Sequence, residues 1–252
     1  MIRERCLLLG APGVGKTYQA VKIAQYAGEE LKKKVLVLDL EDKFEAMVIG
    51  MLGEIPKWMT LKVAVETNEQ PQWIAFKEAI NKADVKEDDW IIVDRIDLAW
   101  EAVMRWYSQY KYGQELAERL AEKAKAMKKA SMFTPRFDQG DWQPINEQYA
   151  SNIMKILYGF RCNVVMTAGI KGLDDNDSRF DILGALGVKP RGQKELGHQP
   201  NTLLLLYQKR VGREVVWKVS TGKDMIGREY FDDDDLIDLS LQYIVAKTPL
   251  GK

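Results

Sequence analysis

Residues 10–17 read GAPGVGKT, and they constrain the fold of this chain more than any other segment. They follow the apolar run 5–9 and fit the pattern G-x-x-x-x-G-K-T, whose glycines let consecutive backbone N–H groups converge on phosphate oxygens. A helix expected over 16–32 points the positive end of its dipole at the same anion. The segment therefore predicts a strand, a phosphate-binding loop and a helix, with a nucleoside triphosphate bound between them.

Each residue of this motif has an expected role. Lys16 should reach the β- and γ-phosphates, and the hydroxyl of Thr17 should ligate Mg²⁺. The alternative is a chance glycine-rich turn, which the strand and helix patterns on either side argue against. The residues that we assign to the ATP site are Gly10, Ala11, Pro12, Gly13, Val14, Gly15, Lys16, Thr17 and Tyr18.

A second motif, WIIVD, occupies residues 90–94. An apolar strand that ends in Asp94 suits a carboxylate holding the Mg²⁺ shell from a neighbouring strand end. The alternative is a buried strand with an incidental polar end. Many such ATPases carry a water-polarising glutamate directly after this aspartate, but here the next residue is Arg95. The catalytic base must therefore come from elsewhere.

Apolar runs alternate with helical segments along the chain, a pattern typical of an α/β fold with a mostly parallel sheet and flanking helices. Buried strands are expected at 5–9, 35–40, 90–94, 162–168 and 202–207, with a weaker edge strand at 61–65. Helices are expected at 16–32, 71–83, 97–130 and 144–160, with loops at 133–144 and 169–200. The segments 202–209 and 213–220 predict a C-terminal antiparallel hairpin.

A third motif, VLVLDLEDKFEA at 35–46, contains Asp39, Glu41 and Phe44. Together the three motifs resemble the RecA/RadA recombinase family of ASCE-type P-loop ATPases, whose second strand ends in D-x-E-x-x-F. The resemblance implies a RecA-like core in which Glu41 activates water. A carboxylate at the carboxyl edge of a parallel sheet also faces the nucleotide crevice. The alternative is that Glu41 is an exposed loop acid.

Two further segments, 141–149 (DWQPINEQY) and 189–198 (KPRGQKELGH), are similar to compact phage- and virus-type members, including Sak-type single-strand annealing proteins. The first strand begins near residue 5, so we expect no recombinase-type filament segment before it. The family's fourth strand often ends in T-N-Q, whereas this chain has Thr167-Ala168-Gly169. The γ-phosphate sensor is thus replaced, with Lys171 as a candidate.

The resemblance also implies that the loops after the third and fourth strands hold nucleic acid. Lysines and arginines beside aromatic residues have the composition of a single-strand groove. The basic run within 122–142 is equally typical of a solvated helix with i,i+4 ion pairs, whereas a long loop at 171–198 favours function. Our candidates for DNA contact are Arg136, Lys189, Arg191 and Lys194.

Basic residues also follow the C-terminal hairpin, in the segment 220–235. In ring-forming relatives such residues reach the γ-phosphate of a neighbouring subunit. The resemblance therefore implies a homo-oligomer, a ring or short filament, in which Lys223 and Arg228 act in trans. The alternative is that both are surface residues beside an acidic tail.

Composition limits the partners and the location. Lys+Arg and Asp+Glu both number 37, so no net charge steers the chain to nucleic acid. No apolar run reaches the ~20 residues of a membrane span, and the charged start of the chain does not resemble a signal peptide. Cys6 and Cys162 lie in apolar runs, which predicts buried, reduced thiols. We expect a cytoplasmic protein of a microbial cell, with a viral origin open.

The sequence thus predicts one RecA-like ATPase domain over 1–252, with a helical insertion at about 97–145, a mobile loop at about 171–198 and an acidic tail at 231–252. The predicted function is Mg²⁺-dependent ATP hydrolysis that acts on DNA, in phage recombination or single-strand annealing. Two alternatives stay open: a DNA-packaging or helicase-like ring motor, and a nucleotide-dependent regulatory or assembly module without DNA. The residues given catalytic roles are Lys16, Glu41, Asp94, Lys223 and Arg228.

Overall fold

The computed structural model describes residues 3–126, 137–173, 187–225 and 231–240. Its main sheet has eight strands in the order β10-β9-β8-β1-β5-β4-β2-β3. The strands from β8 to β3 are parallel, and β9 and β10 are antiparallel additions at one edge. Their bounds are β1 (Arg5–Leu9), β2 (Val35–Asp39), β3 (Met59–Val63), β4 (Trp90–Asp94), β5 (Asn163–Ala168), β8 (Thr202–Val211), β9 (Glu214–Asp224) and β10 (Asp234–Asp235). This confirms the predicted α/β fold and its C-terminal hairpin.

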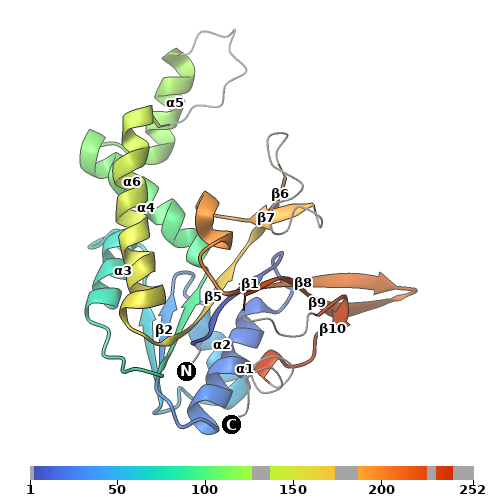
Figure 1. Cartoon of the computed structure of the whole chain (residues 1–252). Coiled ribbons are helices and arrows are strands. Elements are labelled where there is room, and N and C mark those ends of the chain that lie inside the picture. The colour runs from blue at the N-terminus through green and yellow to red at the C-terminus, as the bar shows by residue number, and fades with distance from the viewer. Residues whose placement is uncertain (1–2, 127–136, 174–186, 226–230, 241–252) are drawn as a thin grey trace.

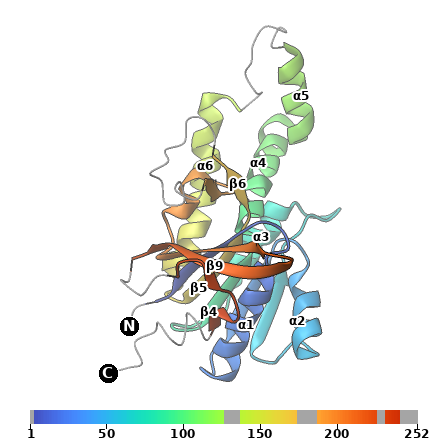
Figure 2. The same cartoon turned by 90° about the vertical axis from the view of Figure 1, so that its right-hand side faces the viewer.

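Helices cover both faces of this sheet (Figures 1 and 2). Strand residues alternate between two cores, so that Leu7 and Leu9 face one layer while Cys6 and Leu8 face the other. Burial on both faces explains why the strands read as continuous apolar runs. One layer contains α1 (Lys16–Glu29) and α2 (Phe44–Leu52), and the other contains α3 (Gln72–Asn81), α4 (Ile96–Tyr112) and α6 (Gln139–Met154).

The helices α4, α5 (Leu116–Ala126) and α6 form an arm that projects from the sheet (Figure 1). The single helix predicted over 97–130 is wrong, because Gly113 adopts φ +65° and ends α4. The loop predicted at 133–144 is wrong in its second half, where α6 already begins. A π-helical turn, η1 (Lys155–Gly159), continues α6 to the end of the predicted helix.

The region 171–198, predicted as a loop, contains regular structure in its described parts. β6 (Ile170–Gly172) and β7 (Val188–Pro190) pair antiparallel as a separate hairpin, and η3 (Lys194–Gly197) is a short 3₁₀ helix. The helix α2 was also not predicted. The predicted edge strand is confirmed as β3 at 59–63. Both cysteines are buried, and neither forms a disulfide. None of the described helices is both long and apolar enough to cross a membrane.

Candidate nucleotide site

The glycine-rich loop joins β1 to α1, and its shape requires glycine at particular positions. A Cβ on Gly10 would lie 2.4 Å from the carbonyl oxygen of Leu206 on β8. Gly13 and Gly15 have φ values of +80° and +91°, which other residues rarely adopt. No side chain caps the start of α1, so its first amides are open to an anion. The local geometry is that of a phosphate-binding loop.

Lys16 lies folded across this loop. Its Nζ donates hydrogen bonds of 2.9 Å to the carbonyl oxygens of Gly10 and Ala11. Burial, followed by the nearby charge of Arg95, lowers the pKa of Lys16. Phosphate oxygens form stronger, charge-assisted bonds with an ammonium group than neutral carbonyls do. Lys16 is therefore held where a phosphate can replace its present partners.

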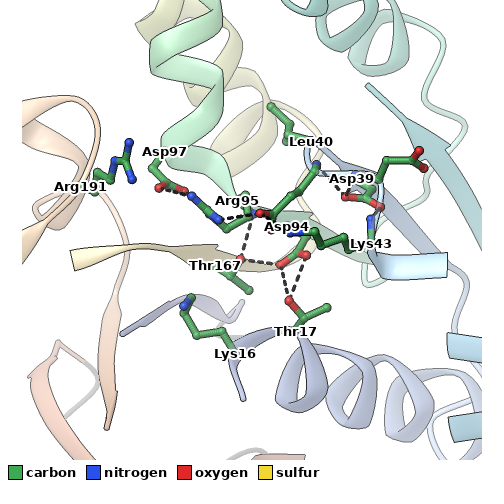
Figure 3. A network of polar contacts seen from close by, with 12 residues as sticks. Lys16, Thr17, Asp39, Leu40, Lys43, Asp94, Arg95, Asp97, Thr167 and Arg191 are labelled. Atoms are coloured by element: carbon green, nitrogen blue, oxygen red, sulfur yellow. Dashed lines mark hydrogen bonds and ion pairs between the residues drawn. The ribbon is translucent and has the colours of Figure 1, made fainter. Parts of the chain in front are cut away.

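Asp94 is fully buried at the end of β4 and is the centre of the polar network in Figure 3. Its carboxylate accepts hydrogen bonds from the hydroxyl of Thr17, at 3.1 Å, and from the hydroxyl of Thr167, at 2.5 Å. Burial raises the pKa of Asp94 from 3.8 to about 6, although both hydroxyls oppose the shift. The fold thus brings together Thr17 and Asp94, which are far apart in the sequence.

These oxygens suit Mg²⁺. A hydroxyl and a carboxylate are hard donors, and Mg²⁺ usually takes only one or two carboxylates while phosphates and waters complete its shell. In the described part of the chain, no three His, Cys, Asp or Glu side chains gather as a metal cluster. The donor set therefore fits a metal that arrives with a nucleotide, held by Thr17 and Asp94.

Glu41 follows the end of β2, the strand next to β4. Its Oε1 accepts hydrogen bonds from Lys43 Nζ at 2.8 Å and from Arg95 Nη1 at 3.1 Å. Burial alone would raise the pKa of Glu41, but the hydrogen bond from Lys43 and the charge of Arg95 outweigh it and lower the pKa. Glu41 is thus a carboxylate with a lowered pKa, and it lies one strand away from Asp94. Its role in activating water stays a prediction.

Three polar residues of the site were not predicted as functional. Thr167 bonds Asp94 and also accepts a 2.9 Å hydrogen bond from the backbone N–H of Arg95. The Arg95 guanidinium donates bonds of 3.0 and 3.1 Å to the buried carboxylate of Asp97. In the sequence, Thr167 could have been found by the same pattern as Asp94, namely a polar side chain near the end of a buried apolar strand. Lys171, the suggested sensor, lies exposed on β6.

Of the residues predicted to contact DNA, the three that the structure describes lie on β7, just after it and on η3. Arg191 donates a 2.8 Å bond to Glu101 on α4 and forms an ion pair with it. Lys194 is exposed on η3, and Lys189 lies on β7. Arg136 lies outside the described residues. Their contact with nucleic acid stays a prediction.

Lys223, predicted to act in trans, lies on β9 opposite Leu203 at the start of β8. Its Nζ donates bonds of 2.8 Å to the carbonyl oxygens of His198 and Pro200, and burial lowers its pKa. This position is at the end of β8 away from the glycine-rich loop, so Lys223 is not part of this chain's own site. Arg228 lies outside the described residues. Action in trans stays a prediction for both.

Comparison with known proteins agrees with this geometry. None of the curated proteins compared with the chain matches it. A family model described as an AAA domain matches residues 2–199, a segment that contains the glycine-rich loop, Glu41, Asp94 and Thr167. Because the match spans well over half of the sequence, this chain belongs to the AAA domain family of P-loop ATPases and is a nucleotide-binding protein of that class.

Proposed function

We propose that this chain hydrolyses ATP with Mg²⁺ and acts on DNA as a RecA-like ATPase. One observation carries the first part: complementary groups meet at the carboxyl ends of neighbouring parallel strands. Lys16 supplies a cation for phosphate, Thr17 and Asp94 supply metal ligands, and Glu41 supplies a carboxylate for water. Phosphoryl transfer needs mainly positioning and charge stabilisation, which these groups can provide.

In the proposed reaction, Lys16 leaves the carbonyl groups of Gly10 and Ala11 and bonds the β- and γ-phosphate oxygens. Thr17 and Asp94 would hold Mg²⁺, which would neutralise negative charge on the phosphates. Thr167 fixes the orientation of the Asp94 carboxylate through its hydrogen bond. Glu41 accepts a hydrogen bond from the water that attacks the γ-phosphate.

Removing the lysine tests the binding half of this proposal. Lys16→Ala should abolish ATP binding measured by calorimetry, because no other described cation bridges the loop carbonyls. Lys22 lies further along α1, paired with Asp238, so Lys22→Ala is a matched control that should bind ATP normally. Unchanged ATP affinity in Lys16→Ala would remove the loop from nucleotide binding.

Replacing the glutamate tests the chemical half. Glu41→Gln should bind ATP like the wild type but lose roughly 10²-fold or more in turnover, since an amide is a poor proton acceptor. Asp42→Asn changes the adjacent, exposed acid and should leave turnover unchanged. Near-normal hydrolysis by Glu41→Gln would show that another group activates water.

The DNA part of the proposal is a role in phage-type recombination or single-strand annealing, carried out by a homo-oligomer. It is supported by the similarity of the three motifs to RecA-like proteins. It is also supported by the ion pair between Arg191 and Glu101, which ties the base of the β6–β7 hairpin to the helix that follows Asp94. A DNA strand bound at this hairpin would lie close to the residues that we propose hydrolyse ATP.

Hydrolysis rates with and without DNA test this part, alongside the measured mass with ATP. Stimulation by single strands, weakened by salt, supports the proposal. Stimulation by duplex DNA alone would favour the ring motor. Binding of ATP with a change of mass and no response to either DNA would favour the regulatory or assembly module.

A further inference from the structure

Arg95 occupies an unusual place in this network. It adopts φ +65°, which is uncommon for a residue with a side chain, and it directly follows the metal-binding Asp94. Its backbone N–H is fixed by Thr167, whose hydroxyl also bonds Asp94. Its side chain bonds Glu41 through Nη1 and Asp97 through Nε and Nη2. One arginine thus joins the acids that flank the metal site.

The Glu41 end of this link restrains the carboxylate. Arg95 and Lys43 both donate to the same oxygen, Oε1. Charge-assisted hydrogen bonds of this kind are strong, and they draw electron density away from the group that accepts them. In this arrangement Glu41 is a weaker acceptor for an attacking water than a free carboxylate.

The Asp97 end of the link is an anchor. Asp97 is fully buried, and its charge is balanced by two hydrogen bonds from Arg95. Moving the guanidinium away would leave a buried carboxylate unpaired, which is strongly destabilising. The position of the Arg95 side chain therefore follows that of Asp97.

Asp97 is packed between the two segments that form the base of the β6–β7 hairpin. A Cβ on Gly169 would lie 3.2 Å from Asp97 Oδ2, and a Cβ on Gly192 would lie 3.2 Å from Asp97 Cα. The N–H of Arg191 donates a 2.8 Å bond to the carbonyl oxygen of Gly169, which joins the two segments. Close-packed contacts of this kind transmit displacement rather than absorb it.

We propose that Arg95 is a positioning residue that keeps the Glu41 carboxylate from accepting a hydrogen bond from the attacking water. Arg95 also couples Glu41 to the base of the β6–β7 hairpin. A ligand that shifts Gly169 and Gly192 moves Asp97, and Arg95 with it, so that Glu41 is released to water. The coupling is reciprocal, so occupation of the nucleotide site also alters the hairpin base. This inference rests on the proposed role of Glu41 in hydrolysis.

Hydrogen exchange tests the coupling without any hydrolysis. With Mg²⁺ and a non-hydrolysable ATP analogue, the wild type should gain protection at 10–17 and change its exchange at 188–192. Arg95→Lys should keep the added protection at 10–17 but lose the change in exchange at 188–192. An ammonium group cannot bond both Glu41 and Asp97 as a guanidinium does.

The outcomes separate this inference from the proposed function. Protection at 10–17 without a change at 188–192 in the wild type would overturn the coupling alone. The same change at 188–192 in Arg95→Lys would also overturn it. No protection at 10–17 in the wild type would overturn both proposals.

A pair of glycine variants tests the restraint on Glu41. Gly169→Ala presses directly on Asp97. For Gly172→Ala, in the same hairpin, no atom of the described residues other than its chain neighbours lies within 4 Å of the new Cβ. Without DNA, Gly169→Ala should raise kcat about threefold or more with little change in KM, and Gly172→Ala should match the wild type. Arg95→Lys should also raise kcat, and adding Gly169→Ala to it should have no further effect.

Equal rates for the two glycine variants would overturn the proposal. Independent, multiplicative effects of Gly169→Ala and Arg95→Lys would do the same, since the two changes would then act by separate routes. A fall in kcat in Arg95→Lys would show that Arg95 supports Glu41 instead of restraining it.

Discussion

Asp39 and Asp94 lie side by side at the carboxyl ends of β2 and β4, paired in register and both fully buried. They differ in their hydrogen-bond donors. Asp94 accepts from two side-chain hydroxyls, those of Thr17 and Thr167. Asp39 accepts bonds of 2.8–3.0 Å from four backbone N–H groups, those of Glu41, Asp42, Lys43 and Phe44.

This difference suits Asp39 to a structural role and Asp94 to the metal-binding role that we propose for it. Backbone amides are fixed in direction, so Asp39 closes the turn after β2, holds the start of α2 and thereby positions Glu41. Hydroxyl groups rotate, so Thr17 can turn its hydrogen away from Asp94 and present its oxygen to a cation, while Thr167 keeps its bond to the carboxylate. Burial and strand position alone do not distinguish the two aspartates, whereas the kind of donor does.

Among the variants that test this comparison, Asp94→Asn should have the largest effect, a fall in the rate of ATP hydrolysis. Loss of the metal-binding charge should lower the rate on the order of 10³-fold, equivalent to several kcal/mol of transition-state stabilisation. The fold should not suffer, because removal of an incompletely paired buried charge relieves a desolvation cost. Measured hydrolysis rates check the first expectation, and thermal unfolding without Mg²⁺ checks that the fold is kept. A variant that keeps a tenth of the activity, or one that unfolds readily, would contradict the assignment.

Asp39→Asn should show the opposite behaviour. The amide retains one acceptor oxygen and places an NH₂ group against backbone donors, so we expect the free energy of unfolding to fall by about 4 kcal/mol. Urea denaturation measures this loss. Asp42→Asn is the control, because Asp42 is exposed and asparagine tolerates its φ of +58°. If the free energy of unfolding falls no further than in this control, Asp39 does not have the structural role that we assign to it.

The smallest expected effect is on the pH dependence of the free energy of unfolding. It is specific to Asp94 and is measured by comparing the wild type with Asp94→Asn. The pKa of Asp94 is raised from 3.8 to about 6, so the folded chain binds more protons than the unfolded chain within this window. Stability relative to Asp94→Asn should therefore be greatest below pH ~4 and fall by up to about 3 kcal/mol as pH rises through 6. Urea unfolding with a chelator at several pH values checks the sign. A difference that is flat, or that grows with pH, would refute the raised pKa.

Strands and strand ends were largely predictable because their signals are local. The buried strands were read from apolar runs, and the glycine-rich loop from its spacing. The helix α2 lacks a local start signal, because no side chain caps it at Lys43 and its first N–H is bound by Asp39, five residues earlier. The break between α4 and α5 depends on one glycine inside an otherwise helical pattern. The β6–β7 pair was missed because each strand has only three residues, too few for a visible alternation.

The sequence by itself determined that this chain has a phosphate-binding loop and acids at the ends of parallel strands, because glycine spacing and apolar runs act over a few neighbouring residues. Only the tertiary structure decided which partners each acid has. The bond from Arg95 to Glu41 spans 54 positions, and the bond from Thr167 to Asp94 spans 73. Such partners depend on strand order and register, which are set by packing of the whole sheet and not by any local pattern.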